Sequence, residues 1–238
     1  MKSFLKRIAR MLGFEIHRYS VKNSDTWRLM AMLTDHEIDV ILDVGANTGG
    51  FAKMLRDFGY DGKIVSFEPC SKAREYLLKN SMVDPLWEIA PRAAIGAENT
   101  EVEINIAANS SSSSVLDMMD SHISAAPHSR YIDKETVPLK TLDDIAPQYF
   151  DSKSKVFLKI DTQGYESMVL DGAEGVMENV VGLQLEMSFV SLYKGQVLYD
   201  ELIERLKAYG FNIWAISTVL SDPNTGRLLQ IDAVFFRD

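Results

Sequence analysis

The sequence predicts an α/β fold with a doubly wound, mostly parallel sheet that ends in a C-terminal antiparallel hairpin. From residue 40 onward, short apolar runs alternate with segments of helical periodicity, which is typical of a parallel sheet covered on both faces. Near the end of the chain, two apolar runs flank the turn-rich residues 221–226, and strands joined by so short a link must be antiparallel. With 238 residues, 46% of them hydrophobic, and no evident linker or repeat, the chain is expected to build one core.

Each expected strand is an apolar run bounded by turn residues. In chain order, the expected strands are 40–44, 64–67, 87–90, 156–160, 180–187, 211–218 and 229–236. The helices follow from apolar spacing: Phe51, Met54, Leu55 and Phe58 recur at i, i+3, i+4 and i+7, and Gly59 is a suitable C-terminal cap. The expected helices are 24–36, 51–58, 71–80, 165–179 and 198–209.

Regularity is lost between residues 96 and 140. Residues 102–106 alternate as a strand does, but 109–114 form a polar, serine-rich turn, and the stretch to about residue 136 shows no strong period. We interpret residues 97–140 as an insertion over the active-site edge of the sheet.

The first twenty residues form a basic amphipathic segment. Within 3–14, Phe4, Leu5, Ile8 and Leu12 recur at helical spacing. Such a helix could lie on an anionic bilayer surface, or it could pack on the domain or on a partner subunit as part of a homodimer. We favour packing, because one short helix is a weak membrane anchor.

Charge and composition exclude several classes. Residues 1–20 have a net charge of +4, from Lys2, Lys6, Arg7, Arg10 and Arg18 against Glu15. The whole chain has a net charge of −9, so the remaining residues carry −13. This acidic balance argues against a nucleic-acid partner, which needs a basic face. No apolar run approaches the ~20 residues of a membrane span, and basic residues interrupt the N-terminus too closely for a signal peptide, so a cytoplasmic location is expected.

Metal and disulfide chemistry are not expected either. The single cysteine, Cys70, excludes a disulfide framework and a cysteine zinc cluster, and it fits a reducing compartment. The four histidines lack metal-binding spacing, so no dedicated transition-metal site is predicted.

The segment 40–50 indicates a ligand site, because an apolar strand runs there into an acid and a glycine-rich loop. Ligands of open parallel sheets bind beyond the carboxyl ends of the strands. We expect Gly45 to allow a tight turn and Gly49 to allow the ligand to approach closely, with Ala46 and Asn47 between them in the cofactor loop. The N–H groups at the start of the following helix favour a negative charge, such as a ligand carboxylate.

Two acids at strand ends indicate which class of ligand the site binds. Asp43 could hold a cationic amino group directly or through water, and Glu68, at the end of the next strand, could accept both hydroxyls of a ribose. Backbone after Pro69 and around Ala93 would line an adenine slot. A glycine pair alone is a common turn, but the two acids favour a cofactor, and the loop lacks the G-x-G-x-x-G spacing of a pyrophosphate site. We therefore expect S-adenosylmethionine (SAM) rather than NAD.

Five segments resemble the FkbM family of SAM-dependent methyltransferases. They are Asp43-Val44-Gly45-Ala46-Asn47-Thr48-Gly49, Phe67-Glu68-Pro69, Ala94-Ile95-Gly96, Thr141-Leu142-Asp143 and Leu158-Lys159-Ile160-Asp161-Thr162-Gln163-Gly164-Tyr165-Glu166, in order from about 39 to 187. The resemblance implies a seven-strand, Rossmann-like class I methyltransferase domain over 21–238 and O-methylation of hydroxyls on natural products or glycans. Thr162-Gln163 departs from the family's more usual Val-Glu. Residues 1–20 and 110–135 fall outside the resemblance, so we expect them to determine which substrate is accepted.

Methyl transfer to a hydroxyl requires alignment of acceptor, methyl and sulfur, and removal of a proton. We expect Asp161 beside the sulfonium as positioner or base, with Lys159 or Glu186 setting its charge. Alternatively, Lys159 forms a structural ion pair with Asp161 or Glu186, because an unpaired buried lysine is costly. His122 and His128 could also supply a base. Asp161 and Glu186 could converge on Mg²⁺, but without a dedicated ligand set we predict no metal.

The expected function is transfer of a methyl group from SAM to a hydroxyl of a sugar, glycan or natural-product acceptor. One alternative is an NAD-dependent oxidoreductase. The other is a non-catalytic SAM-binding accessory protein that acts through its basic N-terminal helix. The identity of the acceptor and the oligomeric state stay open at this point.

Overall fold

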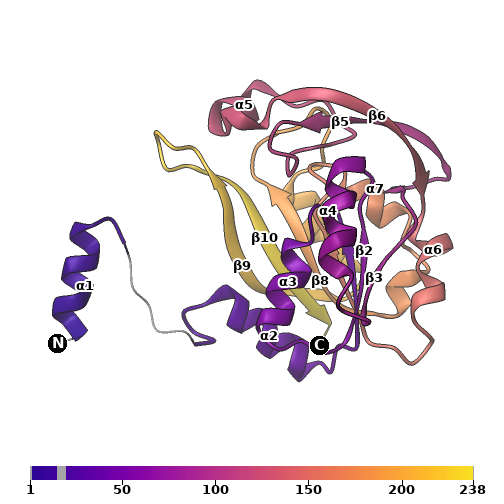
Figure 1. Ribbon diagram of the computed structural model, residues 1–238, viewed down its shortest axis with the longest axis horizontal. Coiled ribbons are helices and arrows are strands. Elements are labelled where there is room, and N and C mark those ends of the chain that lie inside the picture. Colours follow the sequence, from indigo (N-terminus) through magenta and orange to yellow (C-terminus); the bar gives the residue numbers. More distant parts are fainter. Residues whose placement is uncertain (1, 15–19, 238) are drawn as a thin grey trace.

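The computed structural model describes residues 2–14 and 20–237 and contains a seven-stranded sheet with helices on both faces (Figure 1). The strand order is β3-β2-β1-β7-β8-β10-β9. These strands are β1 (Val40–Val44), β2 (Lys63–Phe67), β3 (Trp87–Ile89), β7 (Val156–Ile160), β8 (Val180–Ser188), β9 (Phe211–Ser221) and β10 (Leu228–Arg237). Neighbours are parallel except where β10 pairs antiparallel with β8 and β9, so the predicted fold class is confirmed.

The two faces of the sheet bury two apolar clusters. Successive strand residues point to opposite faces, so Leu42 joins one cluster and Ile41 the other. On the Leu42 side lie α6 (Leu142–Ile145), α7 (Glu166–Asp171) and α8 (Tyr199–Ala208). On the Ile41 side lie α2 (Asp25–Asp35), α3 (Gly50–Asp57) and α4 (Ser71–Ser81). As predicted, Gly59 follows α3 with a left-handed φ of 93°.

The region between 97 and 140 is more regular than predicted. A second sheet of order β4-β6-β5 is formed by β4 (Ala94–Ile95), β5 (Thr100–Ala107) and β6 (Tyr131–Lys140), and α5 (Asp120–Ala125) and a 3-10 turn (Pro127–Ser129) precede β6. Strand β6 was missed because its first six residues are half-buried or exposed, and only Val137 and Leu139 bury apolar side chains. The sheet lies above the main one in Figure 1.

The predicted helix over 165–179 is shorter in the structure. Helix α7 ends at Asp171, and after a turn only a 3-10 segment follows, Val176–Glu178. Gly172 and Gly175 stand in this turn. A Cβ at Gly172 would lie 2.0 Å from the carbonyl oxygen of Gly96, so the chain passes too close to the second sheet for a side chain there. A 3-10 turn also occurs at Pro147–Tyr149.

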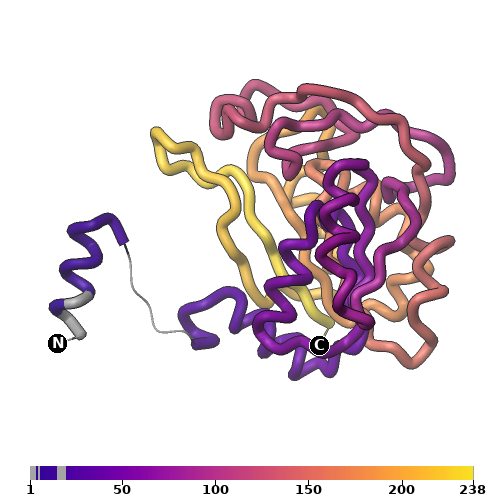
Figure 2. The backbone as a smooth tube through the Cα atoms, in the orientation of Figure 1, coloured from indigo at the N-terminus to yellow at the C-terminus, as the bar shows by residue number. Residues whose placement is uncertain are grey.

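The N-terminal helix is α1 (Lys2–Met11), within the predicted segment 3–14 apart from its ends. It lies apart from the α/β domain in both backbone views (Figures 1 and 2). Glu15 and Arg18, which entered the predicted charge of this segment, lie outside the described residues. Within the described part of the chain, no helix is long and apolar enough to cross a membrane.

Candidate functional site

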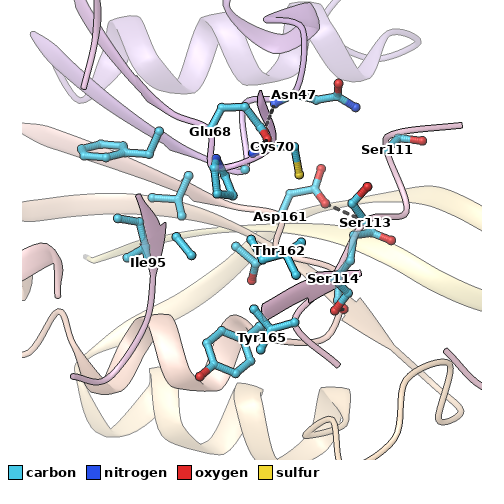
Figure 3. A pocket seen from close by; sticks show the side chains of 18 of the residues that line it. Asn47, Glu68, Cys70, Ile95, Ser111, Ser113, Ser114, Asp161, Thr162 and Tyr165 are labelled. Atoms are coloured by element: carbon cyan, nitrogen blue, oxygen red, sulfur yellow. Dashed lines mark hydrogen bonds between the residues drawn. The ribbon is translucent and has the colours of Figure 1, made fainter. Parts of the chain in front are cut away.

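A pocket of about 670 Å³, partly open to solvent, lies at the carboxyl ends of β1, β2 and β7 (Figure 3). Of the residues predicted to bind the cofactor, those that line it are Gly45, Asn47, Glu68, Pro69, Ala93 and Asp161. Asp43, Ala46 and Gly49 do not line it. The structure therefore brings six of the nine predicted cofactor residues together around one cavity.

Glu68 is a fixed part of the pocket wall. Its Oε2 accepts a hydrogen bond from the backbone N–H of Asn47 at 2.7 Å, and its Oε1 accepts one from that of Cys70 at 2.8 Å. Burial raises the pKa of Glu68, and these two backbone bonds oppose the rise. A carboxylate keeps further lone pairs after two such bonds, so Glu68 can also accept hydroxyl groups of a ligand.

Gly45 lies where the loops after β1 and β7 meet. Its φ is 80°, and a Cβ there would lie 1.8 Å from the carbonyl oxygen of Asp161. The predicted tight turn is thus present, and the close neighbour is backbone. Gly49 also has a left-handed φ, 86°, but a Cβ there would lie 2.6 Å from the ring of Trp87. We correct the prediction for Gly49: the space it leaves is filled by the core and not by a ligand.

Asp43 lies one layer below the pocket. It is fully buried, its Oδ1 is 3.3 Å from Nζ of Lys159, and its Oδ2 accepts a hydrogen bond from the hydroxyl of Ser66 at 3.2 Å. The expected direct contact with a ligand amino group is therefore corrected, because this carboxylate faces the interior of the sheet.

Lys159 joins this buried layer to the pocket. Its Nζ is 3.3 Å from Oδ2 of Asp161 as well as from Asp43, and it donates to the carbonyl of Gly45. Burial alone would lower the pKa of Lys159, but the carboxylates of Asp161 and Asp43 outweigh that effect and raise it. Of the two ion pairs considered from the sequence, the one with Asp161 is present, whereas Glu186 is not an ion-pair partner of Lys159.

Gln163 connects Asp161 to Glu186. Its Nε2 donates to Oδ1 of Asp161 at 2.8 Å and to Oε2 of Glu186 at 2.6 Å, and its Oε1 accepts from the hydroxyl of Tyr193 at 2.6 Å. A glutamate at 163 would place a third carboxylate between two others, and close like charges are unfavourable. The amide of Gln163 therefore bridges the two carboxylates without adding a charge.

Glu186 is a buried neighbour of the site. Its Oε2 also accepts a bond from Nε2 of Gln230 at 2.7 Å. Burial, together with the nearby carboxylates of Asp161, Glu166 and Asp232, raises the pKa of Glu186 well above its usual value. It thus acts on Asp161 through Gln163, and does not line the pocket.

One continuous set of polar contacts crosses six of the seven strands. In spatial order it runs through Trp87, Ser66, Asp43, Lys159, Asp161, Gln163, Glu186 and Gln230. Of these residues, Asp161 and Gln163 line the pocket. We call this set the polar layer.

Glu166 supports the loop after β7. Its Oε1 accepts from the backbone N–H of Thr162 at 2.9 Å, from the hydroxyl of Thr162 at 3.1 Å and from the N–H of Gly164 at 3.1 Å. Burial raises the pKa of Glu166 to about 7. This side chain shapes the loop that carries Asp161 and does not line the pocket.

The histidines considered as bases do not reach the pocket. His122 is buried beside Tyr193, with ring centroids 5.1 Å apart, and burial lowers the pKa of His122. Neither it nor His128 lines the pocket.

The serine-rich segment contributes more than sequence reasoning showed. The hydroxyl of Ser110 donates to Oδ1 of Asn47 at 3.3 Å, and that of Ser114 donates to the carbonyl of Gln163 at 2.7 Å. Residues 110–114 therefore join the loops after β1 and β7, and four of their five side chains line the pocket. The sequence predicted that this segment is a turn within an insertion over the active-site edge, but it did not predict the hydrogen bonds that its run of hydroxyl groups makes to the two loops.

The described residues include no group of three or more histidine, cysteine or acidic side chains placed to hold a metal ion. Asp161 and Glu186 do converge, but the position between them is occupied by Nε2 of Gln163, which donates to both. The prediction that no metal is required still needs a chelation experiment.

The seven-stranded sheet with its C-terminal antiparallel hairpin is the fold of a class I methyltransferase domain. The family model of the methyltransferase FkbM domain matches residues 43–213, and the chain belongs to this family. The resemblance seen in the sequence is confirmed. No match is found among proteins with curated functions.

Solved structures with a similar fold have low sequence identity to this chain. The methyltransferase FkbM from Methylobacillus flagellatus KT has 12% identity and a TM-score of 0.48, over 83% of this chain and 44% of that one. The present chain thus spans less than half the length of that protein. A putative S-adenosylmethionine-dependent methyltransferase from Listeria monocytogenes has 9% identity and a TM-score of 0.48, over 90% of this chain and 98% of that one.

The methyl donor of the family is SAM, and the chemistry of the pocket fits it. Glu68 offers carboxylate acceptors for ribose hydroxyls, Phe67 and Ile95 offer apolar surface for a purine, and Asp161 offers a negative group for a cationic sulfonium or amino group. Lys159 and Gln163 would orient that negative group from below.

Proposed function

We propose that the protein transfers the methyl group of SAM to a hydroxyl of a sugar, glycan or other natural product. The observation that supports this most is the position of Asp161. Its side chain is one-third exposed at the pocket while Lys159 and Gln163 hold its two oxygens from the buried side. When bound, SAM supplies a methyl group activated by its positive sulfur.

The acceptor hydroxyl must lose a proton and must be aligned, and a positioned carboxylate can serve both needs. Each oxygen of Asp161 has one partner in the polar layer and a further lone pair for an acceptor hydroxyl. The hydroxyls of Ser111 and Ser113 line the same cavity and suit a polar acceptor with several hydroxyl groups. These features favour a carbohydrate or polyol over an apolar substrate.

The test is a transfer assay with methyl-labelled SAM and the purified full-length protein. Separate pools of free sugars, nucleotide sugars, glycolipids and polyketides serve as acceptors, and mass spectrometry and release of S-adenosylhomocysteine are the readouts. We expect a product that gains one methyl group and resists mild alkali, as an ether does and an ester does not. Asp161→Asn should lose most of the rate and should still bind SAM, although more weakly, because the carboxylate that faces the cationic groups of SAM is gone.

Three outcomes would contradict the proposal. Methylation of nitrogen or carbon would change the reaction type, and transfer at the normal rate by Asp161→Asn would remove the role of Asp161. SAM binding without transfer to any pool would favour an accessory role. We also expect the rate to persist in a chelator, and a loss that Mg²⁺ restores would overturn the prediction of metal independence.

A further inference from the structure

We propose that α1 docks the protein on an anionic lipid surface. The apolar residues Phe4, Ile8 and Met11 recur along the helix, and Leu12 follows its end. Their side chains are 65%, 40%, 81% and 68% exposed, respectively. At 3.6 residues per turn, Phe4, Ile8 and Met11 fall within an arc of about 60°. The helix thus presents one apolar stripe to its surroundings.

Basic side chains occupy the other side of α1. Lys6, Arg7 and Arg10 are exposed and fall within a separate arc of about 100°. Among the described residues, no ion pair joins Lys6 or Arg7 to the domain. An apolar stripe flanked by cations matches the boundary between acyl chains and anionic headgroups.

Charge separation along the chain makes this helix the part that such a surface attracts. Residues 1–20 carry +4 and the remainder carries −13. Helix α1 lies apart from the domain in Figure 1, so it can reach a surface before the domain does. Repulsion of the acidic domain is screened beyond about 8 Å at physiological ionic strength.

An apolar protein surface fits α1 less well. The domain exposes its own apolar residues along the edge strand β9, where Ile213, Ile216 and Val219 are 39%, 51% and 46% exposed. That strand has no charged residue between 211 and 221, so it could cover the apolar stripe of a second copy but would offer nothing to the cations. An anionic bilayer satisfies both groups at once.

The docking is expected to be weak, reversible and sensitive to salt, because the helix has only ten residues. It does not depend on the proposed methyl acceptor. It concerns where the protein works, and it can be tested without a known substrate.

The experiment is flotation of the full-length protein with vesicles of phosphatidylcholine alone or with about a third phosphatidylglycerol. We expect binding to the anionic vesicles, little binding to the neutral ones, and release at high salt. Because each basic residue contributes about fivefold near an anionic surface, loss of three of them in K6E/R7E/R10E should weaken binding by at least on the order of 100-fold.

The matched control places the same charge change on the domain, as K53E/K72E/K207E, at three exposed lysines. This control should bind the anionic vesicles no more than a few-fold more weakly than the wild type. A second variant, I8Q/M11Q, removes the apolar stripe without changing charge and should also weaken binding. The α1 variants should melt within a few degrees of the wild type, because α1 lies apart from the core. The domain control should do so as well, because its three lysines are exposed.

Equal binding to neutral and anionic vesicles would overturn the proposal. So would an equal loss in the domain control, which would indicate a non-specific charge effect. If the wild type ignores vesicles but forms a dimer that I8Q/M11Q dissociates, the stripe is a contact between copies and the lipid proposal is wrong.

Discussion

Two acids that look equivalent in the sequence belong to different regions of the molecule. Asp43 and Glu68 stand at the ends of neighbouring parallel strands, yet Glu68 lines the pocket and Asp43 lies in the polar layer beneath it. Glu68 is held by backbone N–H groups, whereas Asp43 is held by a buried lysine. We therefore expect the pocket wall to contact the ligand and the polar layer below it to hold the wall in place.

The largest expected effect breaks the polar layer. Lys159→Met leaves Asp43 and Asp161 without their shared cation, and removing one partner of a buried pair costs about 3–5 kcal/mol. Urea denaturation at neutral pH should show a loss of this size in the free energy of unfolding.

The matched double variant, Lys159→Met with Asp43→Asn, removes the uncompensated buried charge and should recover much of that stability. Ser66 can still donate to the amide oxygen of the new asparagine. If the single variant is as stable as the wild type, the polar layer is not what holds this part of the sheet.

The next effect concerns the pocket wall. Glu68→Gln keeps the shape of the side chain but removes the charge that would bond to ligand hydroxyls, and a hydrogen bond to a charged group contributes about 1.5–3 kcal/mol. Calorimetry should show SAM binding about 10- to 100-fold more weakly. The amide nitrogen of glutamine cannot accept the second of the two backbone N–H bonds, so folding should lose about 1–3 kcal/mol, less than in Lys159→Met.

Glu75→Gln, on the exposed face of α4, is the control and should leave SAM affinity unchanged. The contrast between regions fails if Glu68→Gln unfolds the protein as strongly as Lys159→Met, or if it binds SAM normally.

The sequence was sufficient to predict the main sheet because its central strands β1, β2, β7, β8 and β10 are apolar runs that are almost entirely buried. It was also sufficient for the pocket residues Gly45, Glu68 and Asp161, which follow strands directly. The sequence did not distinguish the role of Asp43 from that of Glu68. A position at the end of a strand predicts at which edge of the sheet a side chain lies, but it does not predict whether that side chain reaches the pocket or is buried beneath it. The serine segment and β6 were missed for another reason: they are held by long-range contacts that local periodicity does not record.

A third prediction concerns pH and Glu166. Because the pKa of Glu166 in the folded protein is about 7, above its usual value of 4.5, the folded state holds the proton more tightly than the unfolded state. This group therefore makes the protein less stable as pH rises from about 4.5 to about 7, and the loss is complete above that range. Glu166→Gln keeps an oxygen acceptor for the Thr162 and Gly164 bonds and does not titrate.

We expect the variant and the wild type to be similar in stability near pH 5, and the variant to be more stable by roughly 1–3 kcal/mol at pH 8. Asp232, whose pKa is raised to about 6 mainly by burial, adds the same trend to both proteins and cancels in the difference. A difference that stays constant with pH would show that Glu166 is ionised throughout.

The smallest expected effect tests how far the polar layer influences the pocket. Tyr193→Phe removes the hydroxyl that donates to Oε1 of Gln163 and leaves the Nε2 bonds to Asp161 and Glu186 in place. Stability should fall by about 1 kcal/mol, and SAM affinity should change less than threefold, since Asp161 keeps both of its partners. Tyr76→Phe, at a half-exposed tyrosine on α4, is the control and should change neither quantity. A large loss of SAM affinity in Tyr193→Phe would mean that Gln163 depends on this hydroxyl to hold Asp161. The residues that control SAM binding would then include the polar layer beneath the pocket wall.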